Sequence, residues 1–277
     1  MRTLQTFSRG YRRILRVAVL AAAAVGLLVT ASAVVPATSW AEEDEPPPDD
    51  EPKRDGPLAE APLDNGFYFG VGGVPLMMET GRLSAKIADS EELPLITPGL
   101  DLELHFFGRE TGLFGFSSTL WASEADGEAM DVEVDGWDLQ MDFGTPAANF
   151  GTVSSMILVG LGYAENFIRF DGDFRAVDLG DPDLPSGNGE AKLRQQAFVY
   201  DVALRTDIRD PFGKRRKGGG LWLTGFSVGY KGQAAGRWHR AARRISNVPY
   251  VAERAFFASL HLGLGAGGRN VTDVPVY

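Results

Sequence analysis

Ionisable side chains occupy alternate positions in several short stretches of this chain. Asp101, Glu103 and His105, for example, alternate with large apolar residues. A β-strand points successive side chains to opposite faces, so such groups would share one face of a sheet. The residues that we group on this basis are Asp101, Glu103, His105, Asp138, Asp142, Asp201, Arg205, Lys231 and His261.

Two kinds of chemistry suit this set. Carboxylates around His105 could form a catalytic or metal site. Alternatively, acids and bases inside a narrow barrel would pair and fill its lumen, with the surplus carboxylates hydrated or protonated. We favour the charge network, because the sequence contains no zinc signature, P-loop or nucleophile elbow. Ser259 and His261 share a face, but a hydrolase also needs an orienting group and an oxyanion site. We therefore expect no enzyme, metal or cofactor.

Eight stretches of alternating apolar and polar residues would provide the strands that carry these groups. They span residues 66–74, 99–108, 113–122, 130–143, 152–164, 195–207, 221–231 and 255–265. Most hold about 9–13 residues, close to the length of a tilted transmembrane strand. Strands of soluble proteins are nearer five or six residues long. Strand length therefore favours a membrane protein.

The two faces of these stretches also favour a membrane. In residues 255–265, Phe256 and Leu260 alternate with Ser259 and His261, and elsewhere large apolar residues oppose glycine, serine or charge. A soluble barrel has an apolar interior and a charged exterior. We expect the reverse here, with Leu100, Leu102 and Leu104 facing lipid.

One stretch departs from simple alternation. In residues 130–143 the apolar residues shift from even positions, such as Val134, to odd positions, such as Trp137. Gly136 lies between them, and a glycine bulge there would restore a single apolar face.

Connections and aromatic residues fit the same architecture. Long connections fall mainly after the first, fifth and seventh stretches, whereas the third is short and the sixth is longer than expected. Outer-membrane barrels have long outer loops and short inner turns. Aromatic residues near strand ends would form the two interfacial girdles; they are Phe67, Phe107, Trp121, Tyr163, Trp222 and Tyr230.

The last long connection is basic. Its arginines are Arg237, Arg240, Arg243 and Arg244, and one helical face is possible across residues 237–245. Arginines near an outer rim would bind the phosphates of lipopolysaccharide bidentately. A solvated basic loop is the simpler alternative. A second basic cluster, residues 214–217, should face the periplasm and suggests no function beyond solubility.

The N-terminal region predicts export. Residues 1–41 combine five arginines, an apolar run and a small-x-Ala site, which is typical of a cleaved signal peptide. Residues 42–65 form an acidic, proline-rich, disordered linker, and 66–277 form the barrel. Removing the five arginines leaves 22 basic and 37 acidic residues, a net charge of about −15 that argues against nucleic-acid binding. The chain has no cysteine, so disulfides do not stabilise it.

Across residues 66–265 the pattern resembles the small, eight-stranded outer-membrane β-barrels of Gram-negative bacteria. The resemblance implies an all-β, antiparallel, up-and-down transmembrane barrel that the outer-membrane assembly machinery inserts among lipid and lipopolysaccharide. Such barrels usually end on a terminal aromatic residue, but about a dozen residues separate the last stretch from Tyr277, which leaves the strand count open by one pair. We expect a non-enzymatic, envelope-structural or surface-binding role through the outer loops. A narrow passive channel and a soluble periplasmic barrel for a small apolar ligand are the alternatives.

Overall fold

The computed structural model describes the chain from Asn65 to Gly268. It leaves out 79–92, 94–95, 109–110, 128–129, 177–186, 213–217, 241–242, 246–247 and 249–253. The chain divides into two units, Met1–Glu60 and Ala61–Tyr277, and the second holds every described residue. The predicted signal peptide, nearly all of the linker, the basic cluster at 214–217 and Tyr277 therefore lie outside the described residues.

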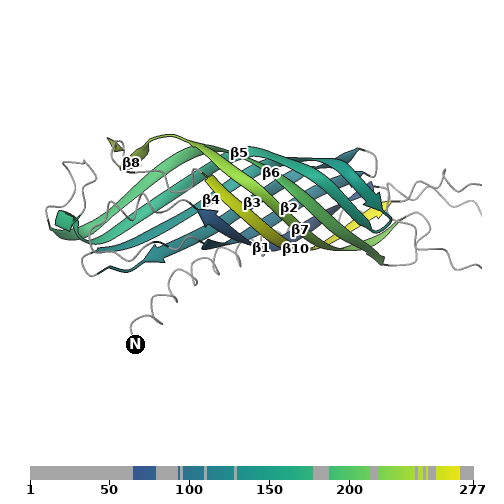
Figure 1. The fold of residues 1–277 in the computed structure, drawn as a ribbon, viewed down its shortest axis with the longest axis horizontal. Helices are drawn as coiled ribbons and strands as arrows, with labels where there is room; N and C mark the ends of the chain where they lie inside the picture. Colours follow the sequence, from purple (N-terminus) through teal and green to yellow (C-terminus); the bar gives the residue numbers. More distant parts are fainter. Residues whose placement is uncertain are drawn as a thin grey trace, which may run out of the picture. The chain divides into compact units, whose positions relative to one another are not determined.

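Eight long antiparallel strands close into a ring (Figure 1). They are β1 (Asn65–Met78), β2 (Ile96–Gly108), β3 (Gly112–Ala125), β4 (Met130–Phe150), β5 (Val153–Asp173), β6 (Asn188–Phe212), β7 (Gly218–Ala235) and β10 (Arg254–Gly268). From β1 to β7, consecutive strands pair with each other, and β10 pairs with both β7 and β1 to close the ring. The prediction of an eight-stranded, up-and-down antiparallel barrel is confirmed, and each predicted stretch overlaps one strand.

Three further elements lie outside the ring. A short 3-10 helix, η2 (Phe174–Ala176), follows β5. Strands β8 (Trp238–Arg240) and β9 (Arg243–Ile245) form a small hairpin between β7 and β10, and β8 adds to the edge of β6 where Arg194 lies opposite His239.

The register of the strands fixes the width of the barrel. From Tyr68, the residues opposite one another around the ring are His105, Gly115, Asp142, Gly160, Asp201, Lys231, Ala255 and finally Met78. The path therefore returns to β1 ten residues further along, since 78 − 68 = 10. With a rise of about 3.3 Å per residue and a strand spacing of about 4.8 Å, this shear tilts the strands by about 40°. Eight strands at this tilt leave an interior just wide enough for side chains.

The two ends of the barrel differ. At one end, which we name the turn end, few residues separate β2 from β3, β4 from β5 and β6 from β7. The turn after β4 is only two residues long, and Gly151 adopts a φ of 68° there, which a side chain would disfavour. The sixth connection, predicted to be longer, is short because β6 and β7 extend toward each other.

At the other end, β4, β5 and β6 run well past the end of β7, and β3 stays paired with β4 as far as Val132. The last pairing between β6 and β7 joins Ala197 to Ala235, yet β6 continues back to Asn188 while still paired with β5. We name this projecting sheet, residues 130–136, 165–173 and 188–196, the extension.

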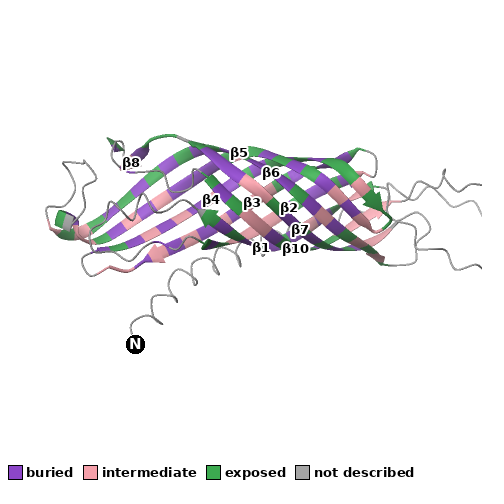
Figure 2. Cartoon of the chain, viewed as in Figure 1, coloured by how far each residue is buried: buried purple, intermediate pink, exposed green. Residues whose placement is uncertain are grey.

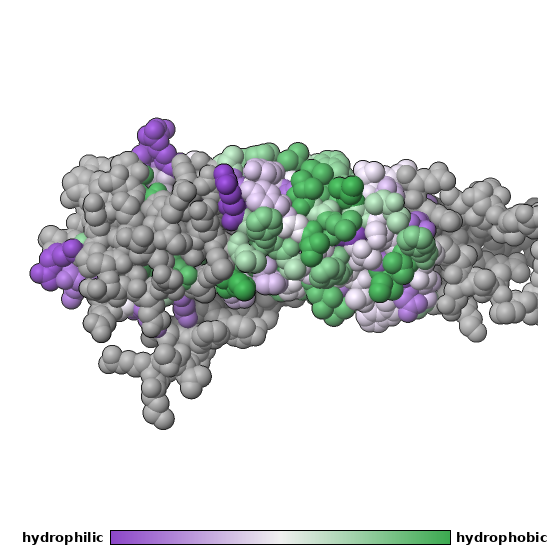
Figure 3. Space-filling model, in the orientation of Figure 1, coloured by the Kyte–Doolittle hydropathy of each residue, from purple (hydrophilic) through white to green (hydrophobic). Residues whose placement is uncertain are grey.

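Large apolar side chains cover the outside of the barrel between these ends, and we name this band of exposed apolar residues the belt. On β10, Phe256, Leu260, Leu262 and Leu264 are 49–64 % exposed, and every ring strand carries outward apolar residues. Buried and exposed residues alternate along the strands (Figure 2). Figure 3 shows apolar side chains gathered over the middle of the barrel on the face in view. Leaving such a belt in water would be very unfavourable, so the belt is the surface that a bilayer covers.

Aromatic pairs border the belt at both edges. Toward the turn end the outward pairs are Phe67–Phe106, Phe114–Phe143 and Phe212–Trp222. Toward the extension they are Trp137–Tyr163 and Tyr230–Phe256. Two predicted girdle residues are placed differently: Phe107 and Trp121 are each only 4 % exposed and point into the lumen.

The predicted bulge at Gly136 is wrong. The pairing of β4 with β5 runs without a shift from Met130 to Pro146. Val134 and Asp138 therefore share the inner face, and Trp137 lies on the outer face. What changes near Gly136 is the surroundings of each face, because the strand leaves the belt there and enters the extension.

Candidate functional site in the lumen

All nine ionisable residues grouped from the sequence point into the lumen. Eight are at most 7 % exposed, and the side chain of Asp101 is 13 % exposed. Apolar clusters lie on both sides of them. Toward the turn end the cluster includes Tyr68, Leu221 and Leu223, and toward the extension a larger one includes Phe170, Leu193 and Trp238. The polar groups therefore occupy a closed compartment at the level of the belt.

Lys231 organises the part of the network nearer the extension. Its ammonium donates to Asp138 Oδ2 at 2.8 Å and to Thr119 Oγ1 at 2.9 Å. The other oxygen of Asp138 accepts from the Gln140 amide at 3.0 Å. Asp201, which lies beside Lys231 on the neighbouring strand β6, accepts from the backbone N–H of Gly160 at 3.1 Å.

Arg205 organises the part nearer the turn end. This fully buried guanidinium donates to Glu103 Oε1 and to Asp207 Oδ1, each at 2.7 Å. Arg209 lies 3.6 Å from the second oxygen of Asp207 and stacks on the Phe107 ring. Asp207 and Arg209 were not among the predicted residues, although they lie two and four residues beyond Arg205 on the same face of β6.

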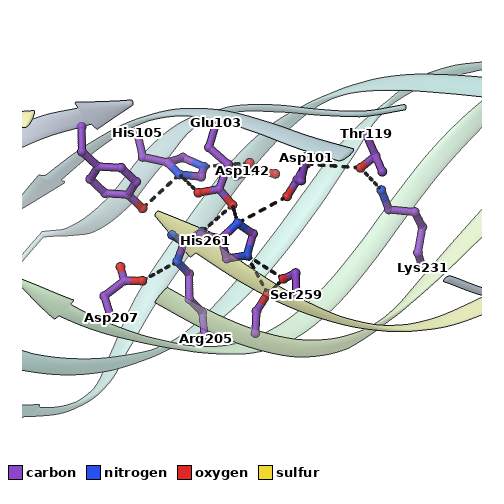
Figure 4. A network of polar contacts seen from close by, with 12 residues as sticks. Asp101, Glu103, His105, Thr119, Asp142, Arg205, Asp207, Lys231, Ser259 and His261 are labelled. Atoms are coloured by element: carbon purple, nitrogen blue, oxygen red, sulfur yellow. Dashed lines mark hydrogen bonds and ion pairs between the residues drawn. The ribbon is translucent and has the colours of Figure 1, made fainter. Parts of the chain in front are cut away.

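The two lumen histidines have different partners (Figure 4). His105 is paired at both nitrogens, to the Tyr68 hydroxyl at 3.0 Å and to Asp142 Oδ2 at 2.8 Å. His261 uses only Nε2, which contacts Ser259 Oγ at 2.5 Å and Ser227 Oγ at 3.2 Å. Its Nδ1 forms no hydrogen bond, although Glu103 Oε1 lies 3.0 Å away.

The Ser259–His261–Glu103 arrangement has the residue types of a hydrolytic triad, but it lacks access. Ser259 and His261 are 3 % and 1 % exposed. Apolar side chains close the lumen on both sides of them, so no acyl substrate reaches the hydroxyl.

A small cavity lies within the network. It measures about 30 Å³ and is lined by Asp101, Glu103, Asp142, Arg205 and Lys231, among others. This volume suits one or two waters, since one water needs about 10–15 Å³ on this measure. Buried atoms of Glu103, Asp142 and Arg205 lack a hydrogen-bond partner, which fits the expected hydration. The cavity is far too small to form a conducting path.

Beyond the belt, the extension reverses the polarity of its two faces. Val132, Ile168 and Leu193 are at most 1 % exposed on its inner face. On its outer face Arg169 bridges Glu133 at 2.6 Å and Glu190 at 3.1 Å. The extension therefore has the polarity of a soluble sheet, and its surroundings must be aqueous.

Acidic residues gather where β3 meets the extension. Partial burial, followed by repulsion from Asp126, Glu133 and Asp131, raises the pKa of Glu124 above its ordinary value. Near η2, by contrast, the Arg175 guanidinium holds the pKa of the half-buried Asp173 below its usual range.

The basic arginines lie in the β8–β9 hairpin, not in the predicted helix. Trp238 and Ile245 lie opposite each other in the hairpin and are both buried in the apolar cluster of the extension. Arg237 and Arg244 are exposed, and Arg240 is half-buried. Alternation between a buried and an exposed face is a strand pattern, because a helix would need a period near 3.6.

The fold and the site define a class of protein: a small, closed β-barrel with lipid outside and a filled lumen. No helix among the described residues is long and apolar enough to cross a membrane. The strand arrangement itself confirms the fold resemblance predicted from the sequence pattern.

Comparisons with known proteins add little beyond the fold. No protein-family model matches the chain, and no curated protein matches it. Among solved structures it is similar to Ail, the attachment invasion locus protein of Yersinia pestis, at 11 % identity and a TM-score of 0.33, over 76 % of this chain and 99 % of Ail. It is also similar to Neisserial surface protein A, at 8 % identity and a TM-score of 0.28, over 74 % and 97 % of the two chains. At such TM-scores neither likeness carries a functional argument.

Proposed function

We propose that this chain is an outer-membrane β-barrel of a Gram-negative bacterium that displays the extension and the β8–β9 hairpin as a binding surface outside the cell. The reversal of polarity along β4, β5 and β6 supports this proposal most strongly. These strands face lipid with apolar residues at one level and face water with charged residues at the next. A filled lumen offers no path for solutes, so the outer surface is the part left to act.

The orientation can be tested along one face of one strand. Lys192, Val202 and Asp210 all point outward on β6, from the extension, the belt and the turn end. The chain has no native cysteine, so each single-cysteine variant carries one reactive thiol. A membrane-impermeant maleimide should label Lys192→Cys on intact cells and Asp210→Cys only after the outer membrane is opened. Val202→Cys should resist the reagent until the barrel is unfolded.

Two results would overturn the proposal. Equal labelling of all three variants in the native protein would mean a soluble barrel, and labelling of Asp210→Cys in intact cells would mean the opposite orientation. Purified protein in planar bilayers should show no conductance above background. A reproducible conductance would favour the narrow channel instead.

We propose that the basic β8–β9 hairpin binds the phosphates of lipopolysaccharide. Its exposed arginines Arg237 and Arg244 lie near Arg194, four residues beyond Phe198, the last exposed apolar residue of β6. At about 3.3 Å per residue, four residues span about 13 Å along the strand, or roughly 10 Å along the barrel axis at a tilt of about 40°. This places the arginines within the phosphorylated inner region of lipopolysaccharide. Guanidinium groups bind phosphate in a bidentate, charge-assisted manner.

A matched pair of variants tests this ligand. Arg237→Gln/Arg244→Gln should weaken binding of purified lipopolysaccharide at least tenfold, since the loss of even one charge-assisted hydrogen bond costs about 1.5–3 kcal/mol. Arg175→Gln, which alters an exposed arginine that pairs with Asp173, should bind like the wild type. Equal binding by the double variant, or undiminished binding of dephosphorylated lipopolysaccharide, would exclude the phosphate contact.

A further inference from the structure

We propose that the lumen binds one divalent transition-metal ion of the Zn²⁺ class, held by Asp101, Glu103 and His261. This site was not expected from the sequence, where His105 was the candidate ligand. It is also separate from the surface role, because the three ligands lie inside the closed compartment.

Three electron-pair acceptors converge in this compartment. His261 Nδ1 lies 3.0 Å from Glu103 Oε1 and 3.7 Å from Asp101 Oδ2, and the three ligand atoms fit within 4.8 Å of one another (Figure 4). Metal–ligand bonds of about 2.0–2.2 Å place tetrahedral ligands about 3.3–3.5 Å apart. The two distances from Nδ1 lie on either side of that spacing, so side-chain shifts of about half an ångström would suit a metal.

The surroundings of His261 Nδ1 support a ligand role, because this nitrogen faces only carboxylates. Its ring is 1 % exposed, and Nδ1 has no hydrogen-bond partner. The other nitrogen contacts Ser259 and Ser227, so an Nε2–H donating to the serines leaves the Nδ1 lone pair directed at two carboxylates. Metal-bound histidines are held in this way, with the second ring N–H fixed by an outer partner.

Space beside His261 is kept open by a glycine. Gly72 lies opposite His261 in the pairing of β1 with β10. A Cβ at Gly72 would lie 2.6 Å from His261 Nδ1, so a larger residue would obstruct the nitrogen. The cavity of about 30 Å³, also lined by Asp101 and Glu103, leaves room for a water as a fourth ligand.

The charge balance of the lumen also favours a cation. The carboxylates are Asp101, Glu103, Asp138, Asp142, Asp201 and Asp207, and the fixed cations are Arg205, Arg209 and Lys231. With both histidines neutral the excess is three negative charges, and with His105 charged beside Asp142 and Glu103 it is two. Either excess is costly in a closed compartment. Arg205 also contacts Glu103, but Asp207 offsets its charge at 2.7 Å. A divalent ion would offset two of these charges.

The test measures metal directly in the full-length protein. The protein is purified in detergent, unfolded in urea with EDTA, freed of chelator, and refolded with Zn²⁺. Elemental mass spectrometry after desalting should find about one zinc per chain. Refolding with Co²⁺ should give a visible absorption band, and the heat-modifiable gel shift reports folding in each sample.

The chain supplies matched controls, because it has only three histidines. His261→Gln and Asp101→Asn should weaken zinc binding by at least the 10–100-fold that loss of an outer-shell partner costs. His105→Gln removes a histidine paired at both nitrogens, and His239→Gln removes the one in the β8–β9 hairpin. Both control variants should keep one zinc per chain.

Several results would refute the site. The site would be refuted if the wild-type protein refolds without retaining zinc. It would also be refuted if His261→Gln binds as much zinc per chain as the wild type. If His261→Gln does not fold, Asp101→Asn decides, because the hydrogen bond from Thr119 to Asp101 Oδ1 is long, at 3.4 Å, so the substitution disturbs little. Loss of zinc in His239→Gln would assign the metal to the surface instead.

Discussion

Lys231 is the cation whose removal tests the lumen network most directly. In Lys231→Met, Asp138 loses a partner at 2.8 Å and Thr119 loses one at 2.9 Å. At an effective dielectric constant of about 20, the Coulomb attraction across 2.8 Å is about 6 kcal/mol. A proton limits the cost, because protonating an aspartate of unfolded-state pKa about 3.9 costs about 4 kcal/mol at pH 7. We therefore expect a loss of about 3–4 kcal/mol in unfolding free energy at pH 7.

The pH dependence makes this prediction specific. At pH 5 the same protonation costs only about 1.5 kcal/mol, so the difference between wild type and variant should shrink to about that value. The sign follows from linkage: the folded variant binds one more proton than its unfolded chain, so its stability relative to wild type rises as pH falls.

A second substitution isolates the uncompensated charge. Lys231→Met/Asp138→Leu removes both partners and should recover about 2 kcal/mol at pH 7 relative to Lys231→Met. Recovery is incomplete because Gln140 and the Thr119 N–H lose their acceptor. Unfolding in urea with lipid vesicles, followed by the heat-modifiable gel shift, measures all three proteins. A cost below 1 kcal/mol for Lys231→Met, or one that does not change with pH, would refute the reasoning.

Other predictions concern the belt, the β8–β9 hairpin and the acidic residues around Glu124. Leu260→Arg, in the middle of the lipid-facing run of β10, should lower the free energy of unfolding in vesicles by about 2–4 kcal/mol. Lys192→Leu on the extension should change it by less than about 0.5 kcal/mol. Similar values for the two variants would contradict the boundary of the belt. Trp238→Ala should release the β8–β9 hairpin to protease while the barrel keeps its gel shift; an intact hairpin would mean that Trp238 is not its anchor. The pKa of Glu124 is raised in the folded protein, so the wild type loses stability as pH rises and this carboxyl ionises. Glu124→Gln should therefore be more stable than the wild type to unfolding in vesicles at neutral pH, and this difference should disappear near pH 4.

The sequence by itself determined the local pattern. Alternation with a period of two placed eight strands and put Asp101, Glu103 and His105 on the face opposite Leu104. This works because side-chain direction in a strand depends only on parity along the chain. Strand length and the apolar outer face then identified the bilayer as the surroundings of the barrel.

The same parity failed to predict what surrounds each face. Val134 and Asp138 share an inner face because β4 continues without a bulge, yet one packs in the apolar cluster of the extension and the other pairs with Lys231. A change of environment along a strand and a change of register give the same pattern in sequence. Only the pairing of neighbouring strands separates them.

The partners of each lumen group also required the tertiary structure. His105 and His261 are both buried and alternate with apolar residues, but His105 forms hydrogen bonds at both nitrogens, whereas His261 Nδ1 faces two carboxylates without a hydrogen bond. A shear of ten decides which strands meet at a given height, and so decides which carboxylate each cation contacts. Parity along one strand carries no information about the register of the next, so the contacts arise only when the ring closes.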